Sequence, residues 1–161
     1  YFTDLRLDAS LTEHWYFYLL GSWERHEFSG FDHRLGLGPG MGCKFLNGPA
    51  QFLFGELGMN YRYEDYADAE EDSEQFLEGR LFGRYKWAFT EKTHFTQELE
   101  YLQSYKREKA LKLKSDTALI TAINRMMALK ITYSVLYNNN PIPSTLENTD
   151  STFTTSLVFT F

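Results

Sequence analysis

Three ionisable residues around one short segment have the types needed to activate a water molecule. His26, Asp32 and His33 flank an expected turn, and Glu24 precedes them on the same segment. An imidazole paired with a carboxylate can act as a general base in hydrolysis. The accompanying serine, Ser29, lies in no recognisable nucleophile motif. A hydrolase that uses His26, Asp32 or His33 is therefore kept as an alternative function.

A second candidate is the glycine-rich segment 34–45, which reads RLGLGPGMGCKF. A phosphate-binding loop needs unevenly spaced glycines before a helix, and no helical pattern follows here. Side chains of a strand point alternately to opposite faces, so glycine at every second position predicts a strand with one bare face. We expect a bulge or bend at Pro39, which breaks one ladder bond. The bare face consists of Gly36, Gly38, Gly40 and Gly42.

The acidic segment 64–75, EDYADAEEDSEQ, could bind Ca²⁺ or bridge to lipopolysaccharide through divalent cations. It lacks the residue order of an EF-hand loop, so a solvated surface loop is the preferred interpretation. The single cysteine, Cys43, excludes an internal disulfide and is read as a small apolar residue. The sequence therefore predicts neither a metal site nor a cofactor.

Alternation of apolar and polar residues is the dominant pattern of the chain. Odd positions are apolar and even positions are polar or small, as in 53–63 and 129–137, and a period of two predicts strands. Turn signals separate nine strands, expected at 1–11, 14–27, 33–46, 51–66, 75–89, 93–106, 111–123, 127–138 and 150–161. Soluble strands are typically about five or six residues long, whereas a tilted strand needs about nine to eleven to cross a bilayer.

Short and long turns alternate along these strands, which is typical of an all-β, antiparallel up-and-down barrel in a single domain, 1–161. The net charge is −6 and no basic patch is present, which argues against nucleic acid as a partner. No run of eighteen apolar residues predicts a transmembrane helix, and a transmembrane barrel would not contain one.

The two faces of the strands allow two architectures. A soluble barrel would enclose the odd, apolar face, and a transmembrane barrel would turn it toward lipid. Aromatic residues gather near the strand ends, as they do at bilayer interfaces, and they are too many to fill a small soluble barrel, so the membrane is favoured. The charges then expected to line the barrel are Glu56, Arg62, Glu78, Arg80, Arg84, Lys86, Glu98, Glu100 and Lys130. The inward rings and side chains expected to cover the glycines are Tyr16, Tyr18, Leu20, Phe52 and Phe54.

The chain resembles a bacterial family of salt-induced outer-membrane β-barrel proteins of unknown function. The resemblance lies in LRLDASLTEHWYFYLLGSWERHEFSGFDHRLGLGPGMG, in FGELGMNYRYEDY and in the ending PIPSTLENTDSTFTTSLVFTF. It implies location in the bacterial outer membrane and contact with its lipid and lipopolysaccharide. Members carry further strands before the part that matches Tyr1, and strand parity then predicts a barrel of about twelve strands, or about ten. The alternating C-terminal residues resemble the signal read by the barrel-assembly machinery: Phe153, Leu157, Phe159 and Phe161.

The predicted function is a non-enzymatic role in the cell envelope, either structural or as a passive pore. Mixed charges on the inner face indicate a packed network of ion pairs, because a charge without a partner there would be costly. The same charges could instead line a channel. Besides the hydrolase, a docking scaffold for another envelope protein is a further alternative. The sequence predicts no solute and no oligomeric state.

Overall fold

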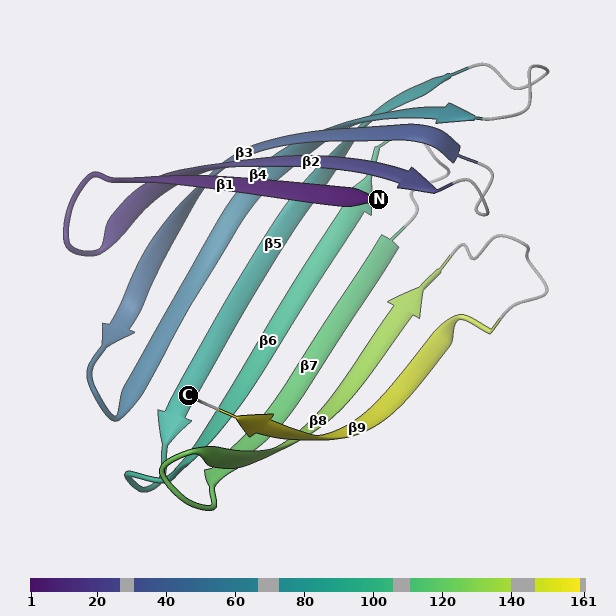
Figure 1. Cartoon of the computed structure of the whole chain (residues 1–161). Helices are drawn as coiled ribbons and strands as arrows, with labels where there is room; N and C mark the ends of the chain where they lie inside the picture. Colours follow the sequence, from purple (N-terminus) through teal and green to yellow (C-terminus); the bar gives the residue numbers. More distant parts are fainter. Residues whose placement is uncertain (27–30, 67–72, 106–110, 140–146, 160–161) are drawn as a thin grey trace. The chain divides into compact units, whose positions relative to one another are not determined.

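The structure, a computed structural model, describes residues 1–26, 31–66, 73–105, 111–139 and 147–159. These residues form nine β-strands, each hydrogen-bonded to the next in chain order from β1 to β9 (Figure 1). The strands are β1 Phe2–Ser10, β2 Trp15–His26, β3 Phe31–Asn47, β4 Gln51–Tyr66, β5 Glu74–Ala88, β6 Thr93–Ser104, β7 Leu111–Ala122, β8 Met127–Asn138 and β9 Thr149–Phe159. The predicted all-β, up-and-down antiparallel topology with nine strands is confirmed, and each strand end lies within two residues of its expected position.

Side-chain oxygens close three of the short turns. Thr12 Oγ1 accepts hydrogen bonds from the backbone N–H groups of His14 at 3.3 Å and Trp15 at 3.0 Å. Thr90 Oγ1 accepts hydrogen bonds from the backbone N–H groups of Lys92 at 3.2 Å and Thr93 at 3.0 Å, in the same pattern. Asn124 Oδ1 accepts a hydrogen bond from the backbone N–H of Met126 in the same turn at 2.8 Å. Such side-chain caps replace backbone partners that the turn removes, which explains why these polar residues end the strands.

The chain divides into two compact units. Unit 1 contains residues 1–43, 56–80 and 102–110, and unit 2 contains residues 44–55, 81–101 and 111–161. Strands β1, β2 and most of β3 therefore belong to unit 1, and β7, β8 and β9 belong to unit 2. Strands β4 and β5 contribute residues to both units, and β6 lies mostly in unit 2.

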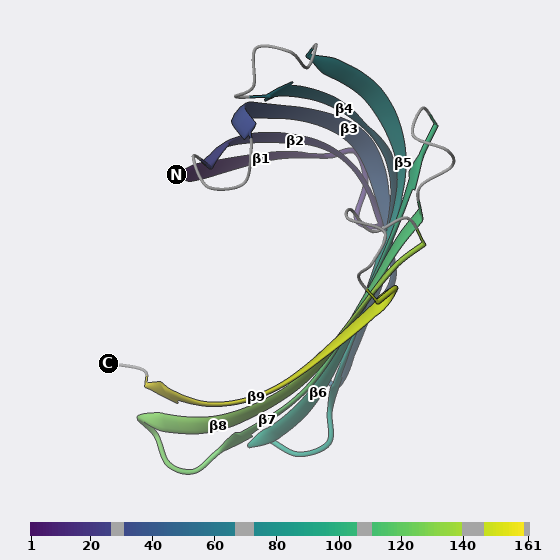
Figure 2. The ribbon, with the colours of Figure 1, turned by 90° about the vertical axis from the view of Figure 1, so that its right-hand side faces the viewer.

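In unit 1, β1, β2 and β3 lie side by side as antiparallel neighbours (Figure 2). The β2–β3 register places Tyr16 opposite Gly42 and Tyr18 opposite Gly40. The register continues without a shift past Pro39, which pairs with Leu19. The β2–β3 ladder therefore has no bulge at Pro39, and its irregularity lies instead between residues 24 and 26, next to the connection to β3. The alternative expectation, a bend at Pro39, stays a prediction.

In unit 2, β7, β8 and β9 form two continuous antiparallel ladders. Thr117 of β7 is opposite Tyr133 of β8, which is in turn opposite Phe153 of β9. Aromatic rings gather beside the turn between β5 and β6. The Trp87 and Phe89 ring centroids are 4.3 Å apart.

The two faces of the strands differ in chemistry. Among the described residues, the buried ones all occupy even positions: Tyr16, Tyr18, Gly38, Gly42, Glu56, Phe76, Glu78, Arg80, Ser104 and Ala118. Most large apolar side chains that are exposed occupy odd positions, among them Leu5 at 58%, Leu57 at 61% and Leu81 at 55%. Glu and Arg are almost never fully buried unless they are paired, so the buried face must supply partners for its charges.

Among the described residues, no helix is long and apolar enough to cross a membrane.

Candidate functional site

The carboxylate of Glu56 is the most deeply buried charged group among the described residues. Glu56 lies on β4 and only 2% of its surface is exposed. Its Oε1 accepts hydrogen bonds from Arg6 Nη2 at 2.6 Å and from the Tyr16 hydroxyl at 2.7 Å. Its Oε2 accepts from Arg80 Nη1 at 2.9 Å and from Arg6 Nη1 at 3.4 Å. Both oxygens of the buried carboxylate are therefore satisfied by donors from β1, β2 and β5.

The glycines of β3 make this arrangement possible. Strand β3 separates β2 from β4, so the phenol of Tyr16 must cross β3 to reach Glu56. A Cβ atom at Gly42 would overlap the Tyr16 ring, and one at Gly40 would overlap the Tyr18 ring. The bare strip on β3 thus provides the space in which both phenols lie.

Two more glycines of the strip also lie under neighbouring side chains. A Cβ at Gly36 would overlap Ser22 Oγ, and one at Gly38 would overlap Asn60 Oδ1. Leu20 Cβ would be 3.5 Å from the added atom at Gly38. The other two rings expected near the strip, Phe52 and Phe54, belong to unit 2, where their centroids are 5.5 Å apart.

The charges around Glu56 balance one another. Arg6 also binds Asp8, with Nη2 2.8 Å from Oδ1 and Nε 2.9 Å from Oδ2. Arg80 Nη1 donates to the Tyr18 hydroxyl at 3.2 Å. Both guanidinium carbons lie over the Tyr18 ring, at 5.0 Å for Arg6 and 5.8 Å for Arg80. Two arginines and two carboxylates give no net charge, and the aromatic face adds cation–π attraction. We call Arg6, Asp8, Tyr16, Tyr18, Glu56 and Arg80 the Glu56 cluster.

The other charges expected to line the barrel are distributed over both units. In unit 1, Arg62 Nη2 is 3.1 Å from Glu78 Oε2, and Glu78 is buried. In unit 2, Arg84 Nε is 2.8 Å from Glu98 Oε1, and the Arg84 guanidinium lies over the Phe54 ring at 5.6 Å. The remaining three expected residues differ in exposure: Lys86 is exposed, and Glu100 and Lys130 are half-buried.

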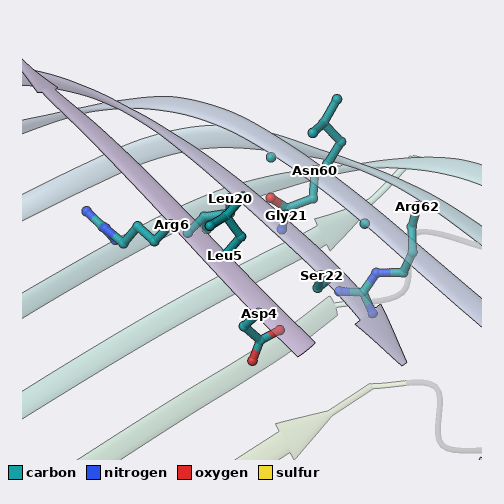
Figure 3. A pocket seen from close by; sticks show the side chains of 11 residues that line it. Asp4, Leu5, Arg6, Leu20, Gly21, Ser22, Asn60 and Arg62 are labelled. Carbon is teal, nitrogen blue, oxygen red and sulfur yellow. The ribbon is translucent and has the colours of Figure 1, made fainter. Parts of the chain in front are cut away.

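Among the described residues, hollows open on the even face in both units, including the following two. The first, of about 330 Å³, lies over β1 to β4 and is lined by Asp4, Leu5, Arg6, Leu20, Gly21, Ser22, Gly36, Leu37, Gly38, Asn60 and Arg62. Figure 3 shows Arg6 and Arg62 extending from different sides of it. The second, of about 270 Å³, is lined by Thr96, Glu98, Lys114, Asp116, Ala118, Lys130, Thr132 and Ser134. Both hollows are large enough for several water molecules, and the polar wall of the second could hold them.

The residues of the hydrolase alternative are only partly described. The side chains of His26 and Asp32 lie outside the described residues. The His33 ring stacks on Trp23, with centroids 6.1 Å apart and planes 26° apart. The contact described for His33 is thus with an aromatic ring, which does not orient an imidazole for base catalysis.

The remaining predicted features are at the chain's edges or in loops. Phe153, Leu157 and Phe159 of the expected assembly signal are exposed, at 68%, 53% and 54%, and Phe161 lies outside the described residues. The centre of the acidic segment, 67–72, also lies outside them. Within the described part of the chain, no three His, Cys, Asp or Glu side chains gather as metal ligands would.

Sequence reasoning did not single out Arg6 as a partner of Glu56, Asp8 as a partner of Arg6, or the two phenols as hydrogen-bonding groups. Alternation places these residues on one face, but it does not say which strands lie close together. The turn closed by Thr12 would have been a usable signal, because a short hairpin sets the β1–β2 register, which pairs Asp8 with Tyr18.

The whole chain, residues 1–161, matches the model of a family described as "Protein of unknown function, DUF481". It is also similar to the uncharacterized protein YdiY of Escherichia coli strain K12, with 33% identity over 148 residues. The match covers 92% of this chain and 56% of YdiY, so the chain spans little more than half the length of that relative. Neither description names a reaction, a ligand or induction by salt, and the salt-induced designation stays a prediction.

Proposed function

This chain belongs to the DUF481 family of proteins of unknown function, and we propose that it forms part of a β-barrel in the bacterial outer membrane. One observation carries the proposal: charged side chains are buried on the even face while leucines are exposed on the odd face. Glu56 and Arg80 are 2% and 8% exposed, whereas Leu57, next to Glu56, is 61% exposed. Water would favour the reverse, and hydrocarbon favours this arrangement.

Further strands would close the barrel, to about twelve in total. The 44% of YdiY that the match does not cover leaves room for them, since the match extends over 56% of that relative. The outer-membrane lipid and lipopolysaccharide would then contact the odd face. The barrel-assembly machinery would insert the protein, with Phe153, Leu157, Phe159 and Phe161 as its signal.

Within this barrel we assign the chain a structural, non-enzymatic role. The Glu56 cluster is a structural part of the sheet. The Glu56 side chain has no exposed surface, and four hydrogen bonds occupy both of its carboxylate oxygens. A catalytic carboxylate must reach its substrate, and this one cannot without loss of the cluster. Separating the strands of unit 1 would break these buried pairs and leave an uncompensated charge. The free-energy cost of that charge keeps the strands together.

A passive pore is the second candidate, and the hollow in unit 2 favours it. Hydroxyl groups of Thr96, Thr132 and Ser134 line it together with charges of both signs. Such a wall suits water and small solutes. Single-channel recording of the complete protein separates the two roles: no conductance supports the structural role. Steady conductance whose ion selectivity changes in Lys130→Glu would establish the pore.

Spin labels test the membrane location itself. We expect nitroxides at Leu57 and Leu81 to be relaxed by lipid-soluble oxygen, because both side chains face outward. Nitroxides at Lys114 and Lys130 serve as matched inner-face controls and should respond to a water-soluble nickel reagent instead. The natural thiol is first removed with Cys43→Ala. The reverse pattern of relaxation would indicate a soluble barrel and refute the proposal.

A further inference from the structure

A cluster of four polar side chains lies close to mid-strand on the odd face of unit 2, across β6, β7 and β8. Gln97 is the fifth residue of the 12-residue strand β6. Ser115 and Thr117 are the fifth and seventh residues of the 12-residue strand β7. Tyr133 is the seventh residue of the 12-residue strand β8. A strand needs about nine to eleven residues to cross a bilayer, so these residues lie near its middle. We call the four residues the polar island.

The island satisfies part of its hydrogen-bonding capacity internally. Gln97 Nε2 donates to Ser115 Oγ at 3.0 Å, and Thr117 Oγ1 donates to Gln97 Oε1 at 2.6 Å. Thr117 is directly opposite Tyr133 in the sheet. In the part of the chain that the structure describes, the hydroxyl hydrogens of Ser115 and Tyr133 have no acceptor. Tyr133 is also 48% exposed, so its hydroxyl is accessible from outside.

The corresponding positions of unit 1 are apolar. Leu5 of β1, Leu19 of β2, Leu37 of β3 and Leu57 of β4 are all exposed on the odd face. Hydrocarbon suits these leucines, but it offers no acceptor to a hydroxyl group. The proposed function requires that the odd face meets lipid. The polar island is then unfavourable on this face, because lipid hydrocarbon cannot hydrogen-bond its polar groups.

We propose that the polar island is the surface through which a second copy of this chain docks in the membrane. A hydroxyl group both donates and accepts, so the island is complementary to itself. A two-fold axis would bring each Ser115 and Tyr133 hydroxyl to an oxygen of the other copy's island. No member carries a charge, so no oppositely charged partner is called for, and small Ser and Thr side chains allow close approach.

The surroundings of the island fit the same partner. Exposed apolar side chains rim it, and the same rim on another copy would pack against them: Leu99 at 49%, Leu113 at 40%, Leu119 at 40% and Phe153 at 68% exposed. Association through packed apolar side chains around a few hydrogen bonds is typical of contacts within membranes.

Disulfide trapping in lipid vesicles tests this docking. The complete protein carries Cys43→Ala and one new thiol, at Leu119 beside the island or at Leu57 on unit 1 as a matched control. We expect Leu119→Cys to form disulfide-linked dimers and Leu57→Cys to remain monomeric. Gln97→Leu combined with Thr117→Val removes two polar side chains from each copy and should lower the apparent association constant at least about tenfold, since each membrane-buried hydrogen bond contributes about threefold. Tyr133→Phe keeps the ring and removes one hydroxyl from each copy, so two hydrogen bonds are lost and the constant should fall about tenfold.

Dimers that form equally in these variants, equal trapping at Leu57, or a monomer in every case would overturn the docking proposal. Capture of another envelope protein in place of a second copy would overturn it as well. A nitroxide at Leu119 separates this failure from failure of the membrane location. Relaxation by oxygen with no dimer refutes docking alone, whereas relaxation by the nickel reagent refutes the barrel in lipid.

Discussion

Gly42→Ala tests whether the bare strip of β3 is a packing requirement. The added Cβ would overlap the Tyr16 ring, whose hydroxyl donates to Glu56 at 2.7 Å. Moving the ring combines overpacking, about 1–3 kcal/mol, with loss of a hydrogen bond to a charged group, about 1.5–3 kcal/mol. A gain of about 0.4–1 kcal/mol from the less flexible unfolded chain offsets part of this. We expect the free energy of unfolding to fall by about 2–5 kcal/mol.

Urea titration of the protein refolded into vesicles, followed by tryptophan fluorescence, measures this change. Gly21→Ala is the matched control, because its added Cβ would be 3.8 Å from Leu5 Cβ, an ordinary contact. It should be neutral or stabilise by up to about 1 kcal/mol. In the background of Tyr16→Leu, where the shorter side chain leaves room, Gly42→Ala should cost less than about 1 kcal/mol. If Gly42→Ala and Gly21→Ala unfold at the same urea concentration, the strip is not a packing requirement.

Three further changes probe the charge network, the lipid-facing surface and assembly. Glu56→Gln should lower the free energy of unfolding by about 3–5 kcal/mol because Arg6 and Arg80 lose their shared counter-charge, whereas Asp8→Asn should cost less than about 1 kcal/mol. Equal urea midpoints for these two variants would contradict the network. Leu57→Lys should cost about 2–4 kcal/mol in vesicles and Leu57→Phe almost nothing, and a harmless lysine would place this surface in water. Phe161→Asp should reduce the amount of protein in the outer membrane without reducing synthesis, and unchanged membrane levels would exclude Phe161 from the assembly signal.

Local patterns were sufficient to predict the strands but not the contacts across them. Alternation and turn signals are both read from neighbouring residues, and the strand ends that the turn signals predict lie within two residues of those observed. It also groups Tyr16 and Glu56 on one face, because both positions are even. That the Tyr16 phenol crosses a whole strand to reach Glu56 depends on residues 40 positions apart in the chain, and no local pattern reports this.

The polar island, on the odd face of the strands, is a second example of contacts that local sequence patterns do not predict. Gln97 and Thr117 are both odd, so alternation classes them with the leucines around them. Their hydrogen bond joins β6 to β7 across 20 positions of sequence, and its recognition requires the pairing of those strands. The expected bulge at Pro39 failed for a related reason: a residue type reports a local preference, whereas the neighbouring strand decides the register.

The partners of Glu56 have a consequence for the order in which unit 1 can fold. They come from positions 50, 40 and 24 residues away in the chain, on β1, β2 and β5. Contacts of such long range close late, because the entropy of closing the intervening loops must be overcome first. A partly assembled sheet that lacks β1 or β5 would bury the Glu56 carboxylate without the guanidinium group of Arg6 or Arg80. Such an unpaired charge is unfavourable away from water. Unit 1 should therefore form in a single cooperative step and leave no stable intermediate that lacks β1 or β5.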